Sequence, residues 1–122
     1  MENRGSQYHR ERLSIAFREE ISSILAGELR DPRIGLVTVT EVVMAPGNKA
    51  MRVYVAVQGT DKEAEESLEG LRTAVGYIRH ELAANLDLRK APEITFHLDR
   101  SEQYNARIDQ LLNRMEKRKK KS

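Results

Sequence analysis

The sequence predicts an α+β fold of two layers, in which helices cover one face of a three-stranded sheet. Two patterns predict it. Apolar residues recur three and four apart in long runs, which is typical of amphipathic helices. Shorter runs are rich in β-branched residues or alternate strictly, which is typical of half-buried strands. At 122 residues, the chain is long enough for one domain with one core.

The first predicted element is a helix over residues 8–29. It must end before Pro32, because the residue before a proline is disfavoured in the α conformation. Residues 1–7 lack the pattern and are expected to be disordered, whereas residues 30–35 (RDPRIG) should form a turn. The apolar side of this helix consists of Leu13, Ala16, Phe17, Ile21, Ile24, Leu25 and Leu29.

Residues 36–44 and 51–57 are predicted to be strands that pair as an antiparallel hairpin. The segment between them holds Pro46, Gly47 and Asn48, which favour a tight turn. The second strand alternates strictly and should bury one face: Met51, Val53, Val55 and Val57 lie on one side, and Arg52, Tyr54 and Ala56 on the other.

A long helical run follows the hairpin, and Thr60 and Glu63 have the spacing of a capping box at its start. A glycine inside a helix costs about 1 kcal/mol relative to alanine. Gly76 is therefore a tolerated glycine without a role, a tight packing contact or a bend, and a bend would expose the N–H groups of a second helix. Arg72 and Arg79 flank Gly76 on one shoulder of the helical wheel. The apolar stripe runs through Ala64, Leu68, Leu71, Val75, Ile78, Leu82 and Leu86.

Residues 91–98 are predicted to be the third strand, with Ile94, Phe96 and Leu98 facing inward. A last helix should follow, capped by Asp99 or Glu102, and residues 117–122 should be a disordered basic tail. Residues 8–116 are then a single domain. The buried side of the last helix would hold Tyr104, Ile108, Leu111, Leu112 and Met115.

Charge is unevenly placed along the chain. Residues 114–122 contain six of the 21 Lys and Arg residues and one of the 19 Asp and Glu residues, so this segment carries +5 and the rest −3. Such a tail either binds phosphate groups or is only a solvated or membrane-surface segment. No apolar run approaches the roughly 18 residues of a membrane span, so we expect a cytoplasmic protein without membrane contact.

Motifs for catalysis and cofactors are missing. The absence of cysteine excludes a disulfide scaffold, a zinc–thiolate site and a thiol nucleophile. The segment HELAA begins like a zinc-protease motif, but Ala84 stands where the second histidine is needed. No glycine-rich phosphate loop is present. We therefore expect no enzyme, no cofactor, no metal and no small-molecule substrate.

The order of elements resembles the type II K-homology (KH) RNA-binding domain, which places a Gly-x-x-Gly loop between its two consecutive helices. Here that position reads Ala74-Val75-Gly76. In this the chain is similar to the ribosome-binding factor A family, in which an Ala-x-Gly kink replaces the loop. The resemblance covers about residues 8–115 and is carried by ELRDPRIG (28–35), VYV (53–55), GYIRHEL (76–82) and APEITFHLDRS (91–101).

This resemblance implies a non-catalytic factor for late assembly of the small ribosomal subunit. Family members bind the immature 30S subunit, contact its 16S rRNA, support maturation of the rRNA 5′ end and matter most in the cold. We expect a monomer. Two alternatives remain open: a free-standing KH-like RNA chaperone without ribosome preference, and a protein-interaction domain with a basic tail.

Candidate RNA contacts are mostly cationic, because phosphate contacts dominate affinity for nucleic acids. Each arginine alone is as well explained by a solvated surface or a salt bridge, and Arg33 has Asp31 two residues away. The candidates are Arg12, Arg33, Arg72, Gly76, Arg79, Arg89 and Lys90, the kink Ala74-Val75-Gly76, and the tail residues Arg118, Lys119, Lys120 and Lys121.

Overall fold

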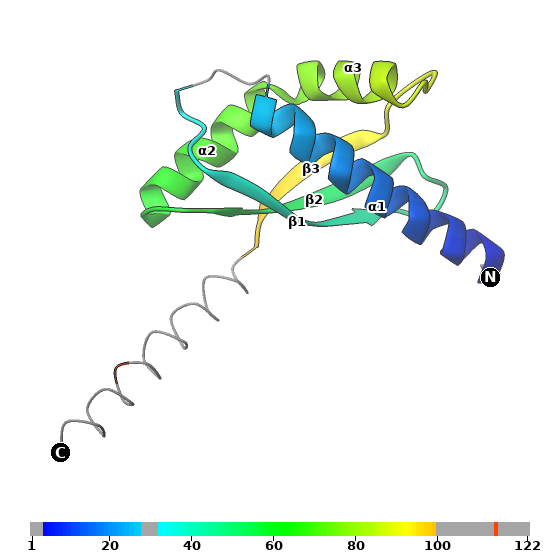
Figure 1. The fold of residues 1–122 in the computed structure, drawn as a ribbon, viewed down its shortest axis with the longest axis horizontal. Helices are drawn as coiled ribbons and strands as arrows, with labels where there is room; N and C mark the ends of the chain where they lie inside the picture. Colours follow the sequence, from blue (N-terminus) through cyan, green and yellow to red (C-terminus); the bar gives the residue numbers. More distant parts are fainter. Residues whose placement is uncertain (1–3, 28–31, 100–113, 115–122) are drawn as a thin grey trace.

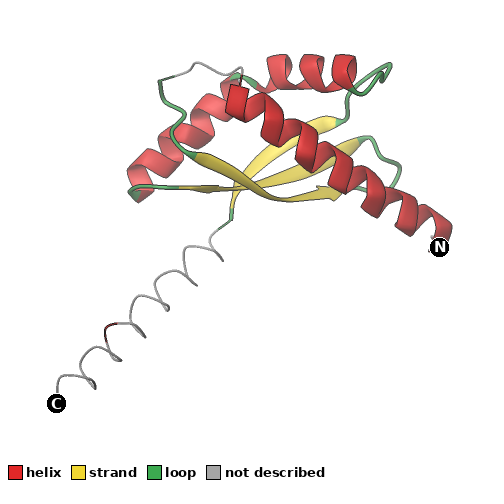
Figure 2. Ribbon diagram, in the orientation of Figure 1, coloured by secondary structure: helices red, strands yellow, loops and turns green. Residues whose placement is uncertain are grey.

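A computed structural model describes residues 4–27, 32–99 and 114 (Figure 1). In this part of the chain the α+β architecture is confirmed, with a layer of helices over a sheet (Figure 2). The elements are α1 (Arg4–Gly27), β1 (Val37–Met44), β2 (Ala50–Val57), α2 (Asp61–Thr73), α3 (Val75–Asn85) and β3 (Glu93–Leu98).

The helices lie on one face of the sheet and enclose a single core with it. Helix α1 crosses β1 and packs against α3, whereas α2 packs against β3 (Figure 1). The inward faces of all six elements contribute to this core. Its largest fully buried side chains are Phe96, Ile21, Ile24, Met51, Leu71, Ile78 and Leu82.

The sheet is mixed, with the strand order β1-β2-β3. The predicted hairpin is confirmed, since β1 and β2 pair antiparallel, with a register shift between Val39 and Glu41. Strand β3 pairs parallel with β2, so the chain crosses over through α2 and α3 before it returns. The crossover brings the residues before β3 next to the turn of the hairpin.

The hairpin turn owes its shape to two residues in the left-handed region, Gly47 (φ 86°) and Asn48 (φ 59°). Glycine and asparagine tolerate that region better than other residues. The turn is closed by the amide of Ala45, which donates to the carbonyl of Ala50 over 2.9 Å. The predicted alternation of β2 is confirmed, because Met51, Val53, Val55 and Val57 are all buried and Arg52 is exposed.

Several predicted boundaries were wrong by a few residues. Helix α1 begins at Arg4, so residues 4–7, expected to be disordered, are helical. A nucleated helix extends cheaply through residues that face solvent, and no apolar pattern marks such an extension. Strand β1 begins at Val37 and β3 at Glu93, one and two residues later than expected. The expected last helix and tail lie outside the described residues, except for Arg114.

The turn before β1 is fastened to α2 by the buried Ser67, whose side chain is 1% exposed. Its hydroxyl donates to the carbonyl of Arg33 over 3.2 Å and accepts from the amide of Gly35 over 3.0 Å. One turn further along α2, Gly70 lies directly beneath Ile34. Both contacts require a small residue on this face of α2.

The predicted capping box is present at the start of α2, since the Thr60 hydroxyl accepts from the amide of Glu63 over 3.1 Å. Helix α2 ends at Thr73 and α3 begins at Val75. The break lies at Ala74 (φ −86°, ψ 2°), two residues before Gly76. Leu71 and Ile78 are fully buried on either side of it, so the apolar stripe continues across the junction.

None of the helices in the described ranges is long and apolar enough to cross a membrane.

Candidate nucleic-acid interface

Two hollows lie along β3, and each contains residues that the sequence singled out. The first, here called the edge groove, has a volume of about 340 Å³ and is lined by Arg72, Val75, Ile94, Thr95, Phe96 and His97. The second, here called the loop pocket, has a volume of about 540 Å³ and is lined by Asn48, Lys49, Ala50, Arg79, Lys90, Ala91, Pro92 and Glu93.

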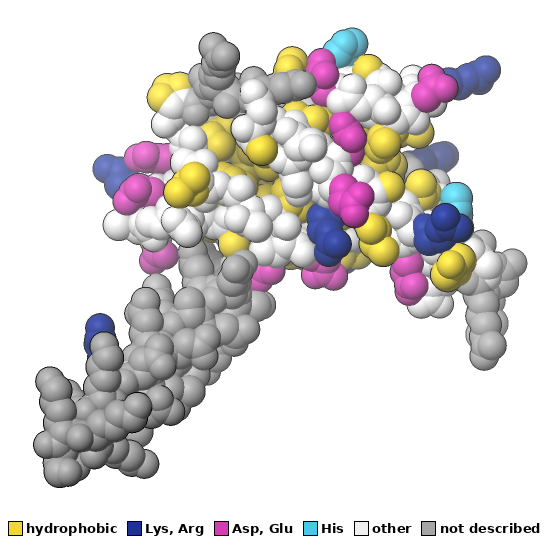
Figure 3. All heavy atoms as spheres, in the orientation of Figure 1, with side chains coloured by type: hydrophobic (Ala, Val, Ile, Leu, Met, Phe, Trp, Pro, Cys, Tyr) yellow, Lys and Arg dark blue, Asp and Glu magenta, His cyan; other side chains and the backbone are white. Residues whose placement is uncertain are grey.

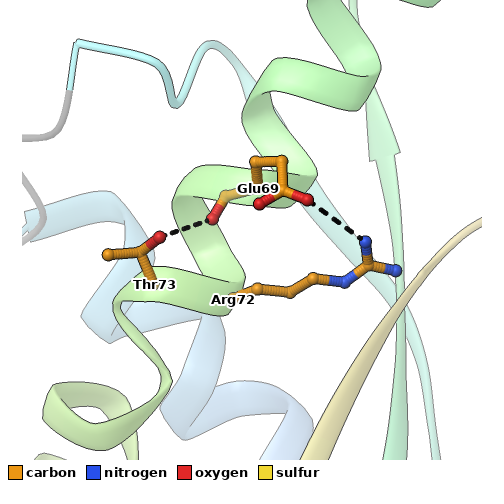
Figure 4. A network of polar contacts seen from close by, with 3 residues as sticks. All are labelled: Glu69, Arg72 and Thr73. Atoms are coloured by element: carbon orange, nitrogen blue, oxygen red, sulfur yellow. Dashed lines mark hydrogen bonds and ion pairs between the residues drawn. The ribbon is translucent and has the colours of Figure 1, made fainter.

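The cation of the edge groove is Arg72, in the last turn of α2. Figure 4 shows it directed away from the helix, with one guanidinium nitrogen 3.8 Å from a carboxylate oxygen of Glu69. The two side chains are 51% and 66% exposed, and an ion pair at such exposure contributes little to stability. The guanidinium can therefore exchange Glu69 for a phosphate at small cost.

The other wall of the edge groove is the open side of β3. Glu93 donates its amide to Lys49 and Asp99 donates to Val55, so the odd-numbered residues of β3 direct their main-chain groups toward β2. The main-chain groups of Ile94 and Phe96 therefore point the opposite way, toward the groove. β3 is the last strand in the sheet order, so these groups have no strand partner within the described sheet. They can hydrogen-bond to an extended ligand.

Gly76 lies at the exposed start of α3, as its second residue. Its φ is not in the left-handed region, and a Cβ added to it would have nothing within 4 Å. Neither packing nor backbone conformation explains the glycine. The start of α3 has no side-chain cap.

The loop pocket is built by three segments that hydrogen bonds join together. The guanidinium of Arg79 donates from Nη2 to the carbonyl of Ala91 over 2.8 Å and from Nε to that of Pro92 over 3.0 Å. The amide of Glu93 donates to the carbonyl of Lys49 over 2.9 Å. Helix α3, the loop before β3 and the hairpin turn are thus held in fixed positions around the hollow.

The remaining candidates do not line either hollow. Arg12 is exposed on α1, with its guanidinium carbon 5.8 Å from the ring centroid of Tyr8. Arg33 and Arg89 are exposed in loops. The Arg33 carbonyl has a structural role, but the expected partner Asp31 lies outside the described residues, as do Arg118, Lys119, Lys120 and Lys121.

Arg72 and Arg79 were expected on one shoulder of a continuous helix, but they line separate hollows. The junction at Ala74 divides the helix between them, and Arg79 faces the start of β3 whereas Arg72 faces its later residues. The structure instead brings Arg79 together with Lys90.

Lys49 is the residue of the loop pocket that sequence reasoning missed. It lies in the hairpin turn, 30 positions from Arg79, and nothing in its local sequence marks it as functional. Only the parallel pairing of β3 with β2 places that turn beside the loop before β3. A prediction of the parallel pairing would have found it.

Acidic and basic side chains are interspersed on the face shown in Figure 3, so no large patch of one charge covers it. Attraction for an anionic ligand is then local and depends on the hollows where cations gather. In the part of the chain that the structure describes, no three His, Asp or Glu side chains group in a way that could hold a metal ion.

Comparison with known proteins identifies the family of the chain. The family model described as ribosome-binding factor A matches residues 9–112. A ribosome-binding factor A of Koribacter versatilis is 58% identical over 122 residues, covering 100% of this chain and 99% of its own length.

One solved structure and one fitted model share the fold. The solution NMR structure of a Thermotoga maritima protein assigned to ribosome binding factor A is 35% identical, with a TM-score of 0.68 over 74% of this chain and 86% of that one. A homology model of Thermus thermophilus ribosome binding factor A, fitted into the cryo-EM map of a 30S complex, is 28% identical. It has a TM-score of 0.55 and covers 75% of this chain and 92% of that one. The fold, the helix junction at Ala74 and these similarities together show that the chain belongs to the ribosome-binding factor A family.

Proposed function

We propose that this protein binds the small ribosomal subunit during its late maturation, and that it contacts 16S rRNA through the edge groove and the start of α3. The observation that carries the proposal is the composition of the groove: one weakly paired arginine, the open main-chain edge of β3, and the start of α3 at Val75, which has no side-chain cap. The arginine and the N–H groups at the helix start attract phosphate. The main-chain groups along the edge of β3 can hydrogen-bond to an extended RNA strand.

The protein acts by occupying its binding site, not by catalysis. The protein holds a site on the immature subunit while rRNA folds, and it supports processing of the 16S 5′ end without performing the cleavage. Ribosome binding in the family supports this proposal, as does the 30S complex into which the Thermus thermophilus relative was fitted. RNA rearrangements slow as temperature falls, so the requirement for the protein should be greatest in the cold.

The test is co-sedimentation of the full chain with purified 30S subunits, 50S subunits and 70S ribosomes at low and moderate salt. Selective recovery with free 30S is expected. If all three particles recover the protein equally and added salt abolishes this binding, the result would favour an RNA chaperone without ribosome preference. Failure to bind any particle would favour a protein-interaction domain.

The groove is tested in the same assay with Arg72→Glu. The matched control is Lys62→Glu, which makes the same charge change at an exposed position of the same helix. Arg72→Glu should lower the affinity for 30S by about tenfold, in the range expected when one charged contact is lost. Lys62→Glu should bind as the unaltered chain does. Equal affinities of the two variants would refute the assignment of the groove.

The processing role is tested by mapping 16S 5′ ends in cells depleted of this protein. Unprocessed ends should accumulate, and more so at low growth temperature. Normal ends at every temperature would remove 5′ maturation from the proposal but would not affect subunit binding.

A further inference from the structure

The loop pocket differs from the edge groove in having three cations in one hollow. Lys49 comes from the hairpin turn, Arg79 from α3 and Lys90 from the loop before β3. Glu93 supplies one carboxylate, so the lining side chains carry a formal charge of +2. Such a cluster is a local focus for an anion.

Part of the pocket is held in place before any ligand arrives. Arg79 is held by two carbonyls, and the turn that carries Lys49 is held by the amide of Glu93. These bonds use two of the five N–H donors of the guanidinium and leave three more. A planar guanidinium fixed in this way suits the oxygens of a phosphate group, and little side-chain entropy is lost on binding.

The position of the pocket indicates what carries the phosphate. Its last lining residue is Glu93, and the edge groove begins at the next residue, Ile94, and continues to His97. Strand residues rise by about 3.3 Å, so the open edge from Glu93 to His97 spans about 13 Å. That is close to the axial length of four stacked nucleotides at about 3.4 Å each. One single strand can therefore lie along the groove with its backbone entering the pocket.

We infer that Lys49, Arg79 and Lys90 form a phosphate-binding pocket for the backbone of a single-stranded rRNA segment, whose following nucleotides lie along the edge of β3. The inference rests on the proposed function for the source of the strand. Arg79 is the fixed member, whereas Lys49 and Lys90 are exposed and close on the phosphate from either side.

The two lysines can be changed without disturbing the fold. The hydrogen bond that holds Lys49 uses its main-chain carbonyl, and the side chains of Lys49 and Lys90 are both exposed. Lys49→Glu and Lys90→Glu should each weaken 30S binding by about fivefold or more. Each should reduce the slope of log affinity against log salt by about 0.7, the value for one lost single-strand contact. Lys62→Glu is the control and should change neither quantity.

A direct titration separates this inference from the proposed function. The ¹⁵N-labelled full chain is titrated with a 5′-phosphorylated tetraadenylate ribonucleotide. Amide shifts should gather at residues 48–50, 90, 91 and 93 and should be lost in Lys49→Glu. If these shifts occur but the chain does not bind 30S, the pocket stands and the proposed function fails. If the chain binds 30S but both lysine variants behave like Lys62→Glu and no shifts occur, the pocket is refuted and the function stands.

The class of occupant is tested by cross-linking, which is simple because the chain has no cysteine. Pro46→Cys puts a single thiol in the hairpin turn, and Lys62→Cys puts one at a remote exposed position. A photoreactive label at position 46 should cross-link to 16S rRNA within the bound subunit, and a label at position 62 should not. Cross-links from position 46 to a ribosomal protein alone would assign the pocket to an acidic protein segment and overturn the inference.

Discussion

Arg79 donates a 2.8 Å hydrogen bond from its guanidinium to the main-chain carbonyl of Ala91, and through it α3 holds the loop that leads into β3. A second bond, to Pro92, uses the same planar group. The sequence presented Arg79 only as a cation beside a glycine. In the structure the same side chain supports the fold and lines a hollow, so its substitution affects both.

Arg79→Lys should therefore destabilise the protein although the charge is kept. Lysine cannot reproduce the forked geometry that reaches two adjacent carbonyls. For a half-buried group we expect a loss of about 1–2 kcal/mol in the free energy of unfolding, measured by urea denaturation. Arg72→Lys is the control, because the Arg72 guanidinium pairs with the exposed carboxylate of Glu69, and this variant should lie within about 0.5 kcal/mol of the unaltered chain. Equal stability of the two variants would contradict a structural role for Arg79.

Ser67→Ala should lower the free energy of unfolding by about 1–3 kcal/mol. The change leaves the carbonyl of Arg33 and the amide of Gly35 without their partner in a buried position. Ser22→Ala is the matched control in another helix, since the Ser22 hydroxyl donates to the carbonyl of Arg18 in an exposed hydrogen bond. That variant should change stability by less than about 0.5 kcal/mol. The stability of both variants is measured by thermal unfolding. If Ser67→Ala is as stable as the unaltered chain, this hydroxyl does not hold the turn against α2.

Gly70→Ala should destabilise the protein by about 1–3 kcal/mol, because the added Cβ would lie 2.6 Å from Cγ1 of Ile34. The better helix propensity of alanine offsets only part of this strain. The strain should disappear when its partner is removed, so Gly70→Ala should cost less in an Ile34→Ala background. A double-mutant cycle in urea measures this, and an unchanged cost would rule out the contact as the cause.

Gly76→Ala is the same substitution on the next helix, and it should have the opposite effect on stability. Nothing lies within 4 Å of the added Cβ, so the free energy of unfolding should rise by about 0.5–1 kcal/mol. Affinity for 30S should fall, because the methyl group blocks close approach of an RNA backbone to the start of α3. Stability is read from urea denaturation and affinity from co-sedimentation. A more stable variant with unchanged affinity would show that the glycine does not serve binding.

The sequence predicted the elements well wherever one face of an element is buried. The stripe from Ala64 to Leu86 and the alternation of Met51 to Val57 are repeated in the burial of those residues, because apolar periodicity directly reflects which side faces the core. The sequence predicted the first and last residues of the elements less accurately. Residues 4–7 are helical, but no periodic pattern of apolar residues marks this first turn.

The site was less predictable than the fold, because it depends on contacts between distant segments. The triplet Ala74-Val75-Gly76 was identified from its local sequence, and the helices do separate there. That Lys49 faces Arg79 follows instead from the parallel pairing of β3 with β2, which no local pattern indicates. Arg72 and Arg79 appeared to be neighbours only because the helical wheel assumes a continuous helix.

The parallel return of β3 also has a consequence for the order in which the protein folds. The antiparallel hairpin joins neighbouring segments and can form as soon as Val57 has been synthesised. Pairing of β3 with β2 must wait until both intervening helices are complete, because the crossover closes a loop of more than 30 residues. A nascent chain therefore carries a hairpin with one edge unpaired for most of its synthesis. The loop pocket and the edge groove, both built on β3, would be the last features to form, so a partly made chain cannot compete with the finished protein for its binding site.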